Sequence, residues 1–545
     1  MAVLASLNCS FPQLLGFVLA LATSYGLYAF YAALTSQRPY RDIPLIDNGD
    51  GGLEEGKRRF IADSRAVVGA AVKQAKGAIC QIYTDAGPKI LLDTKHIPEI
   101  GNDPNFSFAE FVRREMMTDS AFKDFSMGHR YMELFKKVVR VDLTQALPKL
   151  TVALSEETAL AMSTLFPPSA DWTPTPQPVY PLLVALVSQL SARAFLGAPI
   201  CRDPAWLRIS ATYTRDMFLA VQALRRYPPW LRPAAQRFWV PQVRTLREVH
   251  GVAHAIVQAE LARRRGVWAE QAKAGEKKPA RREKPVDTLQ WFEDAVAAED
   301  GVQVGAADIA NAQLSLTMAA IHTTSSALTH ALLDLAARPA LVDELRREIV
   351  DVLGSHASPS DEGTTKPPAA VWQKTSLYRL RLLDSVLKES QRLNPTNLLS
   401  VKRVVTAPTV LADGTRIPRG AAVAVPVDYM IARPEYAAPP PDTFDGRRFV
   451  RLRERPGEQN RWQYATTSKE HFGFGVGAHS CPGRFFASNE LKIALVHALV
   501  RYDWRFVGEK QGVEGRPRNV MRVDQIIPDQ TAKLEYRERV PEIVL

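Results

Sequence analysis

Residues 471–490 read HFGFGVGAHSCPGRFFASNE, and the surroundings of Cys481 in this stretch decide the fold. Pro482 suits the first position of a following helix, so Cys481 is expected to cap that helix. Free backbone N–H groups at the helix start would then point at the sulfur and stabilise a thiolate. With Phe474 covering it, such a shielded thiolate suits an axial ligand of iron.

Glycines give this loop its expected shape. Gly475 and Gly477 let the chain fold tightly before the cysteine, and Gly483 allows a close backbone approach after it. The alternative is a buried structural cysteine that merely precedes a helix. A disulfide framework or zinc cage is disfavoured because the cysteines lie far apart and form no CxxC pair. They are Cys9, Cys80, Cys201 and Cys481.

The segment FGVGAHSCPG, residues 474–483, resembles the haem-binding loop of the cytochrome P450 family, Phe-x-x-Gly-x-(Arg/His)-x-Cys-x-Gly. The resemblance extends from about residue 40 to the end of the chain. It implies a mainly α fold with small β-sheets, and haem b (iron protoporphyrin IX) with Cys481 as its axial thiolate and metal ligand. The chain looks most like membrane-bound, filamentous-fungal members of the secondary-metabolism type.

Two further segments match family landmarks. The segment LDSVLKESQRLNP contains Glu389 and Arg392 on one helix face, and FDGRRF supplies Arg448, although Gly446 and Arg447 replace the usual Pro-Glu. By resemblance, Glu389, Arg392 and Arg448 form a buried charge network with a structural role. A surface ion pair would be the usual explanation for Glu389 and Arg392 taken alone.

The segment LSLTMAAIHTTSSALTHALLDLA, residues 314–336, has a long helical pattern. By resemblance it is the oxygen-binding helix, with Thr323 as the threonine that steadies oxygen and its proton supply. His322 stands where the family usually has Asp or Glu, and we assign it a part in proton delivery. The alternatives are a threonine that bonds to its own helix and a histidine that is simply a satisfied polar residue.

The haem propionates need cations, and the resemblance assigns three cofactor-binding residues to them. Arg403 and His479 stand at matching positions, and Arg140 matches the arginine of a Trp-x-x-x-Arg pattern in which Lys136 replaces the tryptophan.

The N-terminus predicts a membrane anchor. Residues 14–34 are predominantly apolar and long enough to cross a bilayer, and no basic segment precedes them as in a signal peptide. Positive charges follow from Arg38 onward, which places the rest of the chain on the cytosolic side. We therefore expect an anchor at 1–36, a catalytic domain at 37–545, and a single-pass protein of the endoplasmic reticulum membrane.

The pattern of the remaining chain is mainly helical. The segment 340–354 predicts a helix that ends at Gly354, and 409–426 predicts a hairpin around Asp413-Gly414 with a second turn near Gly420. Polar loops are expected at about 262–286 and 354–370.

The function expected from these features is oxidation of a hydrophobic secondary metabolite with O₂. The metabolite would be terpenoid, indole-diterpene or polyketide-like. The chain carries no flavin or nicotinamide motif, so electrons would come from NADPH through NADPH–cytochrome P450 reductase, with cytochrome b5 as a further candidate donor. The net charge of +11 comes without a nucleic-acid-binding motif, so no nucleic-acid partner is expected. The alternatives are a haem-thiolate isomerase or dehydratase, and a non-catalytic haem-binding membrane sensor.

Overall fold

The computed structural model describes residues 38–46, 51–118, 122, 129–273, 284–297, 305–354, 371–373, 375–436 and 438–545, with five single positions between 16 and 26. Within this described part, no helix is both long enough and apolar enough to cross a membrane. Apart from those single positions, the anchor predicted at 14–34 lies outside the described residues, and it stays a prediction.

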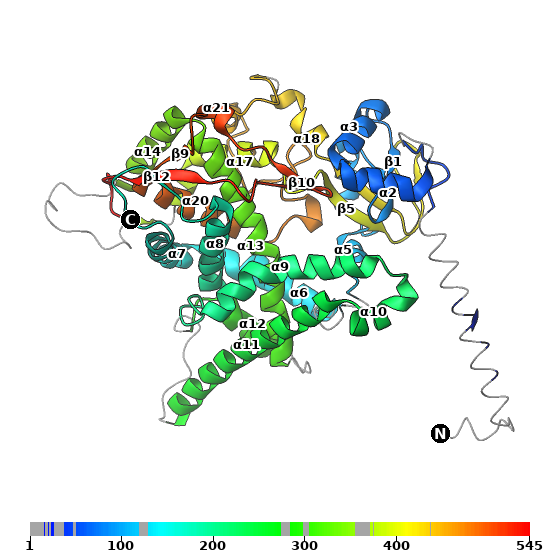
Figure 1. Ribbon diagram of the computed structural model, residues 1–545, viewed down its shortest axis with the longest axis horizontal. Helices are drawn as coiled ribbons and strands as arrows, with labels where there is room; N and C mark the ends of the chain where they lie inside the picture. The colour runs from blue at the N-terminus through cyan, green and yellow to red at the C-terminus, as the bar shows by residue number, and fades with distance from the viewer. Residues whose placement is uncertain are drawn as a thin grey trace.

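The helix α13 (Ala306–Ala336) is the axis of the helical part of the molecule (Figure 1). It packs against α8 (Val179–Phe195), α9 (Pro204–Arg225) and α11 (Pro241–Lys273), and also against α17 (Arg381–Leu393) and α20 (Arg484–Arg501). Most of α13 is enclosed by these neighbours, and its buried residues include polar ones such as Gln313, Thr329 and Asp334.

The remaining helical elements are divided between the larger core around this axis and smaller cores. The α-helices are α2 (Gly52–Ala62), α3 (Ser64–Ala75), α4 (Ile97–Ile100), α5 (Phe108–Met116), α6 (His129–Lys137), α7 (Thr144–Leu165), α10 (Arg232–Phe238), α12 (Thr288–Ala297), α14 (Pro339–Gly354), α16 (Ser376–Arg379), α18 (Asp428–Ile431), α19 (Arg448–Arg453) and α21 (Gly512–Gly515). Shorter turns of 3₁₀ type are η2 (Thr94–His96), η5 (Pro229–Leu231), η6 (Pro434–Tyr436) and η7 (Gly477–His479), and η4 (Val138–Leu143) is a short π-helix. The helices α2, α3, α4 and α18, for example, pack into the core of a five-stranded sheet.

The sheets are small. The largest has the order β1-β2-β8-β5-β3, with only β2 and β8 parallel. Its strands are β1 (Cys80–Thr84), β2 (Gly87–Leu91), β3 (Phe106–Ser107), β5 (Leu399–Val405) and β8 (Ala422–Pro426). The others are β4 (Thr173–Pro174), β9 (Tyr502–Phe506) and β12 (Leu534–Glu538) in a three-stranded sheet, and the hairpins β6 (Thr409–Val410) with β7 (Arg416–Ile417) and β10 (Val520–Arg522) with β11 (Gln525–Ile527). Figure 1 shows β1 and β5 beside α2 and α3 at one end of the molecule, with β9 and β12 near α14 and α20 at the other. The predicted class, mainly α with small sheets, is confirmed.

A second core lies beneath the five-stranded sheet and reaches the cysteine loop. Phe472 and Val476 of that loop are buried in it together with strand residues such as Val423 and Val425. The loop is therefore held between this sheet core and α20, the helix that follows Cys481. Its shape depends on two independently packed parts of the fold.

Two local predictions are confirmed. The strands β6 and β7 pair antiparallel across the turn at Gly414, whose φ is +85°, and Gly420 makes the second turn with φ +81°. The helix α14 ends at Gly354 as predicted. Most of the loop predicted at 354–370 lies outside the described residues.

The loop predicted at 262–286 is wrong in its first part, because α11 continues to Lys273. Ion pairs keep this charged stretch helical. Glu260 accepts hydrogen bonds from Arg263 and Arg264, each at 2.8 Å, which are the i,i+3 and i,i+4 pairs that stabilise helices. Arg264 also binds Asp287 at 2.8 Å, so its charge is paired on both sides within the fold.

A buried charge network joins α17 to the segment that leads toward the cysteine loop. The carboxylate of Glu389 accepts bonds from Arg392 at 2.7 and 2.8 Å and from Arg448 at 3.0 Å. The side chains of Glu389 and Arg392 are 0% exposed and that of Arg448 is 2% exposed. The guanidinium of Arg448 also donates to the carbonyls of Tyr436 and Thr443, so its charge is solvated by backbone dipoles. The structure thus forms the predicted network.

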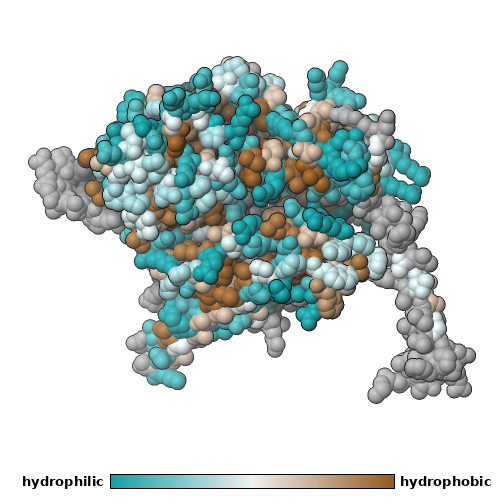
Figure 2. Space-filling view, in the orientation of Figure 1, coloured by the Kyte–Doolittle hydropathy of each residue, from teal (hydrophilic) through white to brown (hydrophobic). Residues whose placement is uncertain are grey.

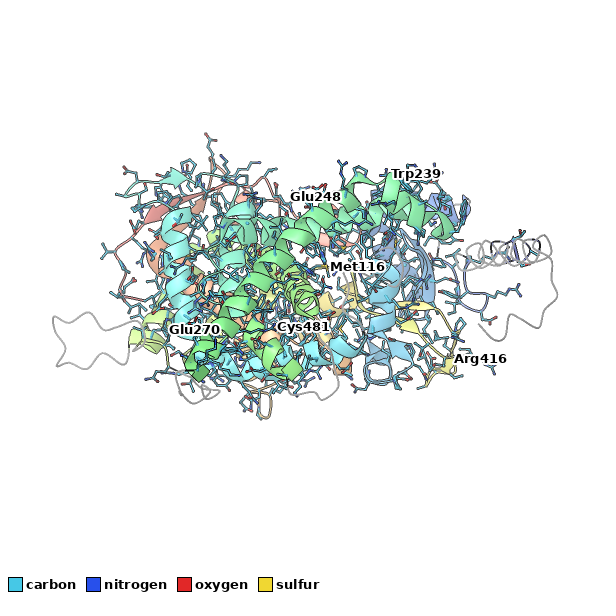
Figure 3. All side chains as sticks on the ribbon, turned by 90° about the horizontal axis from the view of Figure 1, so that it is seen from below. Met116, Trp239, Glu248, Glu270, Arg416 and Cys481 are labelled. Atoms are coloured by element: carbon cyan, nitrogen blue, oxygen red, sulfur yellow. The ribbon has the colours of Figure 1, made fainter. Side chains whose placement is uncertain are left out.

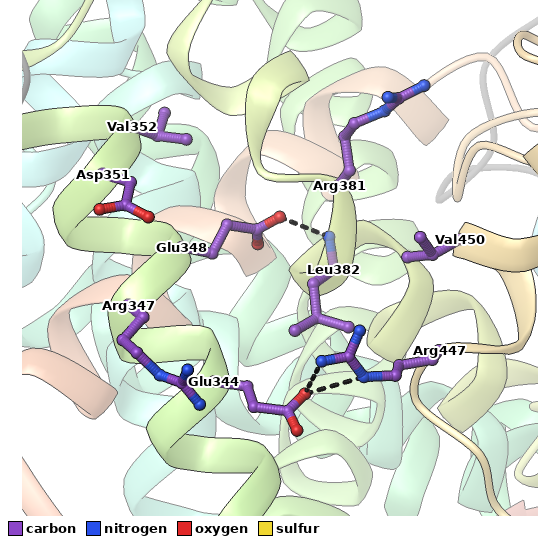
Figure 4. A pocket seen from close by; sticks show the side chains of 9 residues that line it. All are labelled: Glu344, Arg347, Glu348, Asp351, Val352, Arg381, Leu382, Arg447 and Val450. Carbon is purple, nitrogen blue, oxygen red and sulfur yellow. Dashed lines mark hydrogen bonds and ion pairs between the residues drawn. The ribbon is translucent and has the colours of Figure 1, made fainter. Parts of the chain in front are cut away.

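The neighbouring Arg447 pairs at the surface instead. It binds Glu344 of α14 at 2.6 Å, and both side chains keep contact with solvent. This pair borders a surface groove of about 460 Å³ between α14, α17 and α19, where Glu348 caps α17 by accepting the N–H of Leu382 (Figure 4). The groove is lined mainly by charged side chains and contains none of the predicted site residues.

We predict that Arg448→Gln lowers the free energy of unfolding by about 3–5 kcal/mol, because it leaves the buried Glu389 charge with one partner fewer. The matched control, Arg447→Gln, should lower it by less than about 1 kcal/mol, since its ion pair is exposed. Urea unfolding followed by circular dichroism measures both. If Arg448→Gln cannot be purified, Arg448→Lys takes its place. Equal effects at 447 and 448 would contradict the network's structural role.

Candidate active site

Cys481 lies immediately before α20, and two backbone amides hold its sulfur. The N–H groups of Gly483 and Arg484 are hydrogen bonded to it, and the N–H of Cys481 itself donates to the carbonyl of Phe474 at 2.8 Å. The helix begins at Arg484 with Gly483 as its cap, so the predictions that Cys481 caps the helix and that Pro482 opens it are wrong. The predicted amides at the sulfur are nevertheless present.

Burial raises the pKa of the Cys481 thiol, while the amides of Gly483 and Arg484 and the Arg484 guanidinium act in the opposite direction. Hydrogen bonds alone therefore do not make this sulfur a thiolate. A bound metal cation would, because a coordinated thiol loses its proton outright. The surroundings of the Cys481 sulfur therefore favour binding of a metal cation.

The structure requires glycine at some positions of the cysteine loop and not at others. Gly475 and Gly477 have φ of +70° and +62°, and a Cβ on Gly477 would overlap the carbonyl of Gly101. A Cβ on Gly483 would make only an ordinary contact with Val139, at 3.8 Å, so no described protein atom requires glycine there, and its close approach to the cofactor stays a prediction. Asn102 fixes the loop tip by accepting the N–H of Ala478 at 2.9 Å, a contact that the sequence pattern did not reveal.

Phe474 belongs to the same loop and packs edge-on against Tyr464, with ring centroids 5.1 Å apart. Its side chain is partly buried against the larger core. This packing fixes the position of Phe474, whose carbonyl accepts the hydrogen bond from the backbone N–H of Cys481.

The middle of α13 presents an open face although the helix runs through the core. Ala319 and Thr323, four residues apart and so on the same face, are exposed, whereas Ile321 and Thr324 are buried. The Thr323 hydroxyl donates to the carbonyl of Ala319 at 2.8 Å, as the back-bonding alternative expects. Its oxygen lone pairs stay available on the open side.

His322 lies among the packed helices beside α13. Its Nδ1 lies 3.0 Å from the hydroxyl of Tyr180 on α8, and its Nε2 lies 3.2 Å from the carbonyl oxygen of Ala211 on α9. Burial lowers its pKa, and a neutral ring protonated on Nε2 satisfies both partners. This placement favours a structural role that joins three helices, and the predicted part in proton delivery gains no support from it.

Arg403 is a buried cation that lacks a carboxylate partner among the described residues. Its side chain is 2% exposed, and its Nε and Nη2 atoms are buried without a hydrogen-bond partner there. Burial lowers the pKa of Arg403 to about 10. Unsatisfied buried donors are rare, so a group that is not part of the chain is expected to bind here.

An irregularity in the backbone of β5 sets the direction of the Arg403 side chain. The pairing of β5 with β8 shifts register between Ser400 and Arg403, and Val401 within the shift has φ +49°. A β-branched residue in this region is strained, and bulges of this kind redirect side chains next to functional sites.

Other cations converge on the same place. Burial is the main cause that lowers the pKa of His479 to about 4, and the charges of Arg403, Lys136 and Arg140 lower it further. Arg140 also donates to the carbonyl of Ala478 in the cysteine loop at 3.2 Å. The structure thus brings together the three predicted propionate ligands. Lys136, which the sequence showed only as a replaced tryptophan, also acts on His479, although its Nζ already pairs with Glu133 at 2.7 Å; its i,i+4 spacing from Arg140 was the available signal.

The site therefore offers a sulfur held by amides, an open helix face of small residues, and cations without enough anions. Haem, with an iron for the sulfur and two propionates for the cations, fits these features. In agreement with this, the family model described as Cytochrome P450 matches residues 180–525.

Known fungal proteins are similar over most of the chain. Cytochrome P450 monooxygenase pyr3 of Aspergillus fumigatus is 36% identical over 90% of this chain and 87% of its own length. Cytochrome P450 monooxygenase esdpI of Penicillium shearii is 37% identical over 84% of both chains. Cytochrome P450 monooxygenase 1 of Gibberella fujikuroi is 36% identical over 85% of this chain and 98% of its own. The chain belongs to the cytochrome P450 family and is a monooxygenase with a haem-thiolate cofactor.

We expect Arg403→Gln to weaken haem retention, because it removes charge-assisted bonds worth about 1.5–3 kcal/mol, or roughly tenfold or more in the rate of haem loss. Transfer of haem to excess apomyoglobin measures that rate. Arg416→Gln, on the exposed part of β7, is the control and should leave it unchanged. Unchanged haem loss in Arg403→Gln would remove Arg403 from the cofactor site.

Proposed function

We propose that the chain is a membrane-anchored monooxygenase that uses haem b to oxidise a hydrophobic secondary metabolite of terpenoid, indole-diterpene or polyketide-like type. Its electrons come from NADPH through NADPH–cytochrome P450 reductase, with cytochrome b5 as a further candidate donor. The observation that carries the cofactor assignment is the combination of a sulfur held by two amides with the buried Arg403, whose Nε and Nη2 have no hydrogen-bond partner among the described residues.

The residues divide the work between them. Cys481 holds the iron, and Arg403, His479, Arg140 and Lys136 bind the propionates. When bound, haem supplies the activation of O₂ and the insertion of one oxygen atom into the substrate. On the open face of α13, the small side chain of Ala319 leaves room for the cofactor and Thr323 can hold a proton at Oγ1. The backbone amides of Gly483 and Arg484 tune the electron donation of the sulfur.

Membrane attachment is supported by the apolar segment 14–34 and by a surface feature of the described part. Large aromatic side chains are exposed around η5 and α10, namely Trp230, Phe238 and Trp239, which are 63%, 74% and 52% exposed. Figure 2 shows hydrophobic side chains, interspersed with hydrophilic ones, where Figure 1 places α9, α11 and α12, with a further group in the upper half of the view. Aromatic residues suit a membrane–water interface, so this side would face the endoplasmic reticulum membrane from the cytosol.

The iron ligand can be tested directly. We predict that Cys481→Ala loses the thiolate signature in the spectrum of the ferrous carbonyl complex, because the variant lacks the sulfur that the amides of Gly483 and Arg484 hold. The control Cys201→Ala removes a buried sulfur elsewhere and should keep the signature. A signature that survives in Cys481→Ala would mean that another residue binds the iron.

Thr323 separates monooxygenation from the rearrangement alternative. We expect Thr323→Ala to keep haem and substrate binding but to consume NADPH with little product and with release of peroxide. The product formed per NADPH should fall up to roughly 100-fold, the lower end of what a positioned proton donor contributes. Thr329→Ala is the matched control, because Thr329 makes the same back-bond, at 2.7 Å to Ser325, from a fully buried position. Coupling that equals wild type in both variants would remove Thr323 from oxygen activation, and product that forms without NADPH would favour an isomerase or dehydratase.

A further inference from the structure

Two histidines of α11 and one asparagine of α13 converge at a place that the oxidation chemistry does not use. His250 and His254 lie one helical turn apart, with ring centroids 4.0 Å apart. Their Nε2 atoms lie 2.7 and 3.0 Å from the same atom, Oδ1 of Asn311. Figure 3 shows how α11 crosses the molecule from Trp239 past Glu248, just before this pair, toward Glu270.

Two imidazole rings contact the same side-chain oxygen. Each ring directs a nitrogen at one amide oxygen, so two N–H donors share a single acceptor. Both histidines are half-buried, which leaves them within reach of small solutes, while Asn311 is 8% exposed and fixed in the core. The three atoms thus form a small, partly open cluster of two nitrogens and one oxygen.

We propose that His250, His254 and Asn311 form a binding site for a divalent transition-metal ion, with zinc as the best match. Histidines at i and i+4 on one helix face bind such ions, and imidazole suits zinc, copper and nickel. The two Nε2 atoms and Oδ1 would supply three ligands and water the fourth of a tetrahedral zinc site. Metal binding would replace the two N–H protons that now point at the oxygen.

The ligand set explains why the site differs from ordinary acidic or cysteine-rich metal sites. Within the described part of the chain, no group of three or more His, Cys, Asp or Glu side chains is placed to hold a metal ion. The third ligand here is a neutral amide oxygen. The site would therefore bind reversibly rather than as a permanent structural zinc, and a carboxylate in place of the amide should strengthen it.

The position gives the metal a structural consequence. It would bridge α11, which packs on α9, to α13, whose open face carries Thr323. A bound ion would fasten the outer helices to the central one. We therefore expect zinc to raise the thermal stability of the protein.

The experiment uses the full-length, haem-loaded enzyme after chelator treatment and titrates it with ZnCl₂ by calorimetry. Wild type should bind one zinc ion that is lost, by at least roughly tenfold in affinity, in His250→Ala and in His254→Ala. Asn311→Asp should bind zinc more tightly. Gln258→Ala, at an exposed position one turn further along α11, should match wild type. The haem spectrum and zinc-free melting temperature of each variant report whether it is folded.

Thermal unfolding with and without zinc provides the second measurement. The melting temperature of wild type and Gln258→Ala should rise with zinc, and that of the double variant His250→Ala/His254→Ala should not. Binding isotherms that are the same in all variants, or absent in wild type, would overturn the proposal. The cluster would then be only a hydrogen-bonded contact between α11 and α13.

Discussion

The interaction on which the rest of the structure depends is the contact of one carboxylate, Glu389, with two buried guanidinium groups. Burying three charges is unfavourable unless each has partners, and here backbone carbonyls of the segment 431–443 receive the remaining donors of Arg392 and Arg448. The network therefore does more than pair opposite charges. It forces an irregular stretch of chain to wrap around the two arginines, and that stretch leads on to the cysteine loop.

The cofactor site differs from this network, because its polar and charged groups are not all paired within the described protein. Arg403 is buried with unpaired donors, His479 is held neutral by burial and by neighbouring cations, and the Cys481 thiol has a raised pKa. Each of these is unfavourable in the protein alone and becomes favourable when haem supplies two carboxylates and a metal cation. Whatever binds the native state and not the unfolded chain stabilises it, so cofactor binding and the stability of this region are coupled. The strained turn at Val401 belongs to the same arrangement.

The sequence predicted those parts of the site that depend on local geometry. A cysteine before a helix, glycines at positive φ and a Glu-x-x-Arg pair each carry their structure within a few residues, and the structure places them as expected. It could not predict contacts that depend on which neighbours cover a helix face. His322 and Thr323 are adjacent in sequence, but about 100° apart around α13, so one meets α8 and α9 while the other meets open space. The extension of α11 was missed for a similar reason, since Asp287, far along the chain, pairs Arg264 and makes a charged helix stable. Lys136 and Asn102 are recognisable as site residues only once the cysteine loop is folded beside them.

These contacts together explain why the chemistry is confined to one face of the central helix. Polar groups on α13 each fix a different neighbour. Asn311 contacts the histidines of α11, and His322 joins α8 and α9. Near the other end, the buried Asp334 accepts hydrogen bonds from Ser390 of α17 and from Arg516, at 2.7 and 2.6 Å. A polar group inside a core is tolerated only where it finds a partner, so these pairings set the rotation of α13 about its axis. With that rotation fixed, Ala319 and Thr323 must face the side that the protein does not fill. The reactive face of the helix is thus determined by the polar groups that point away from it.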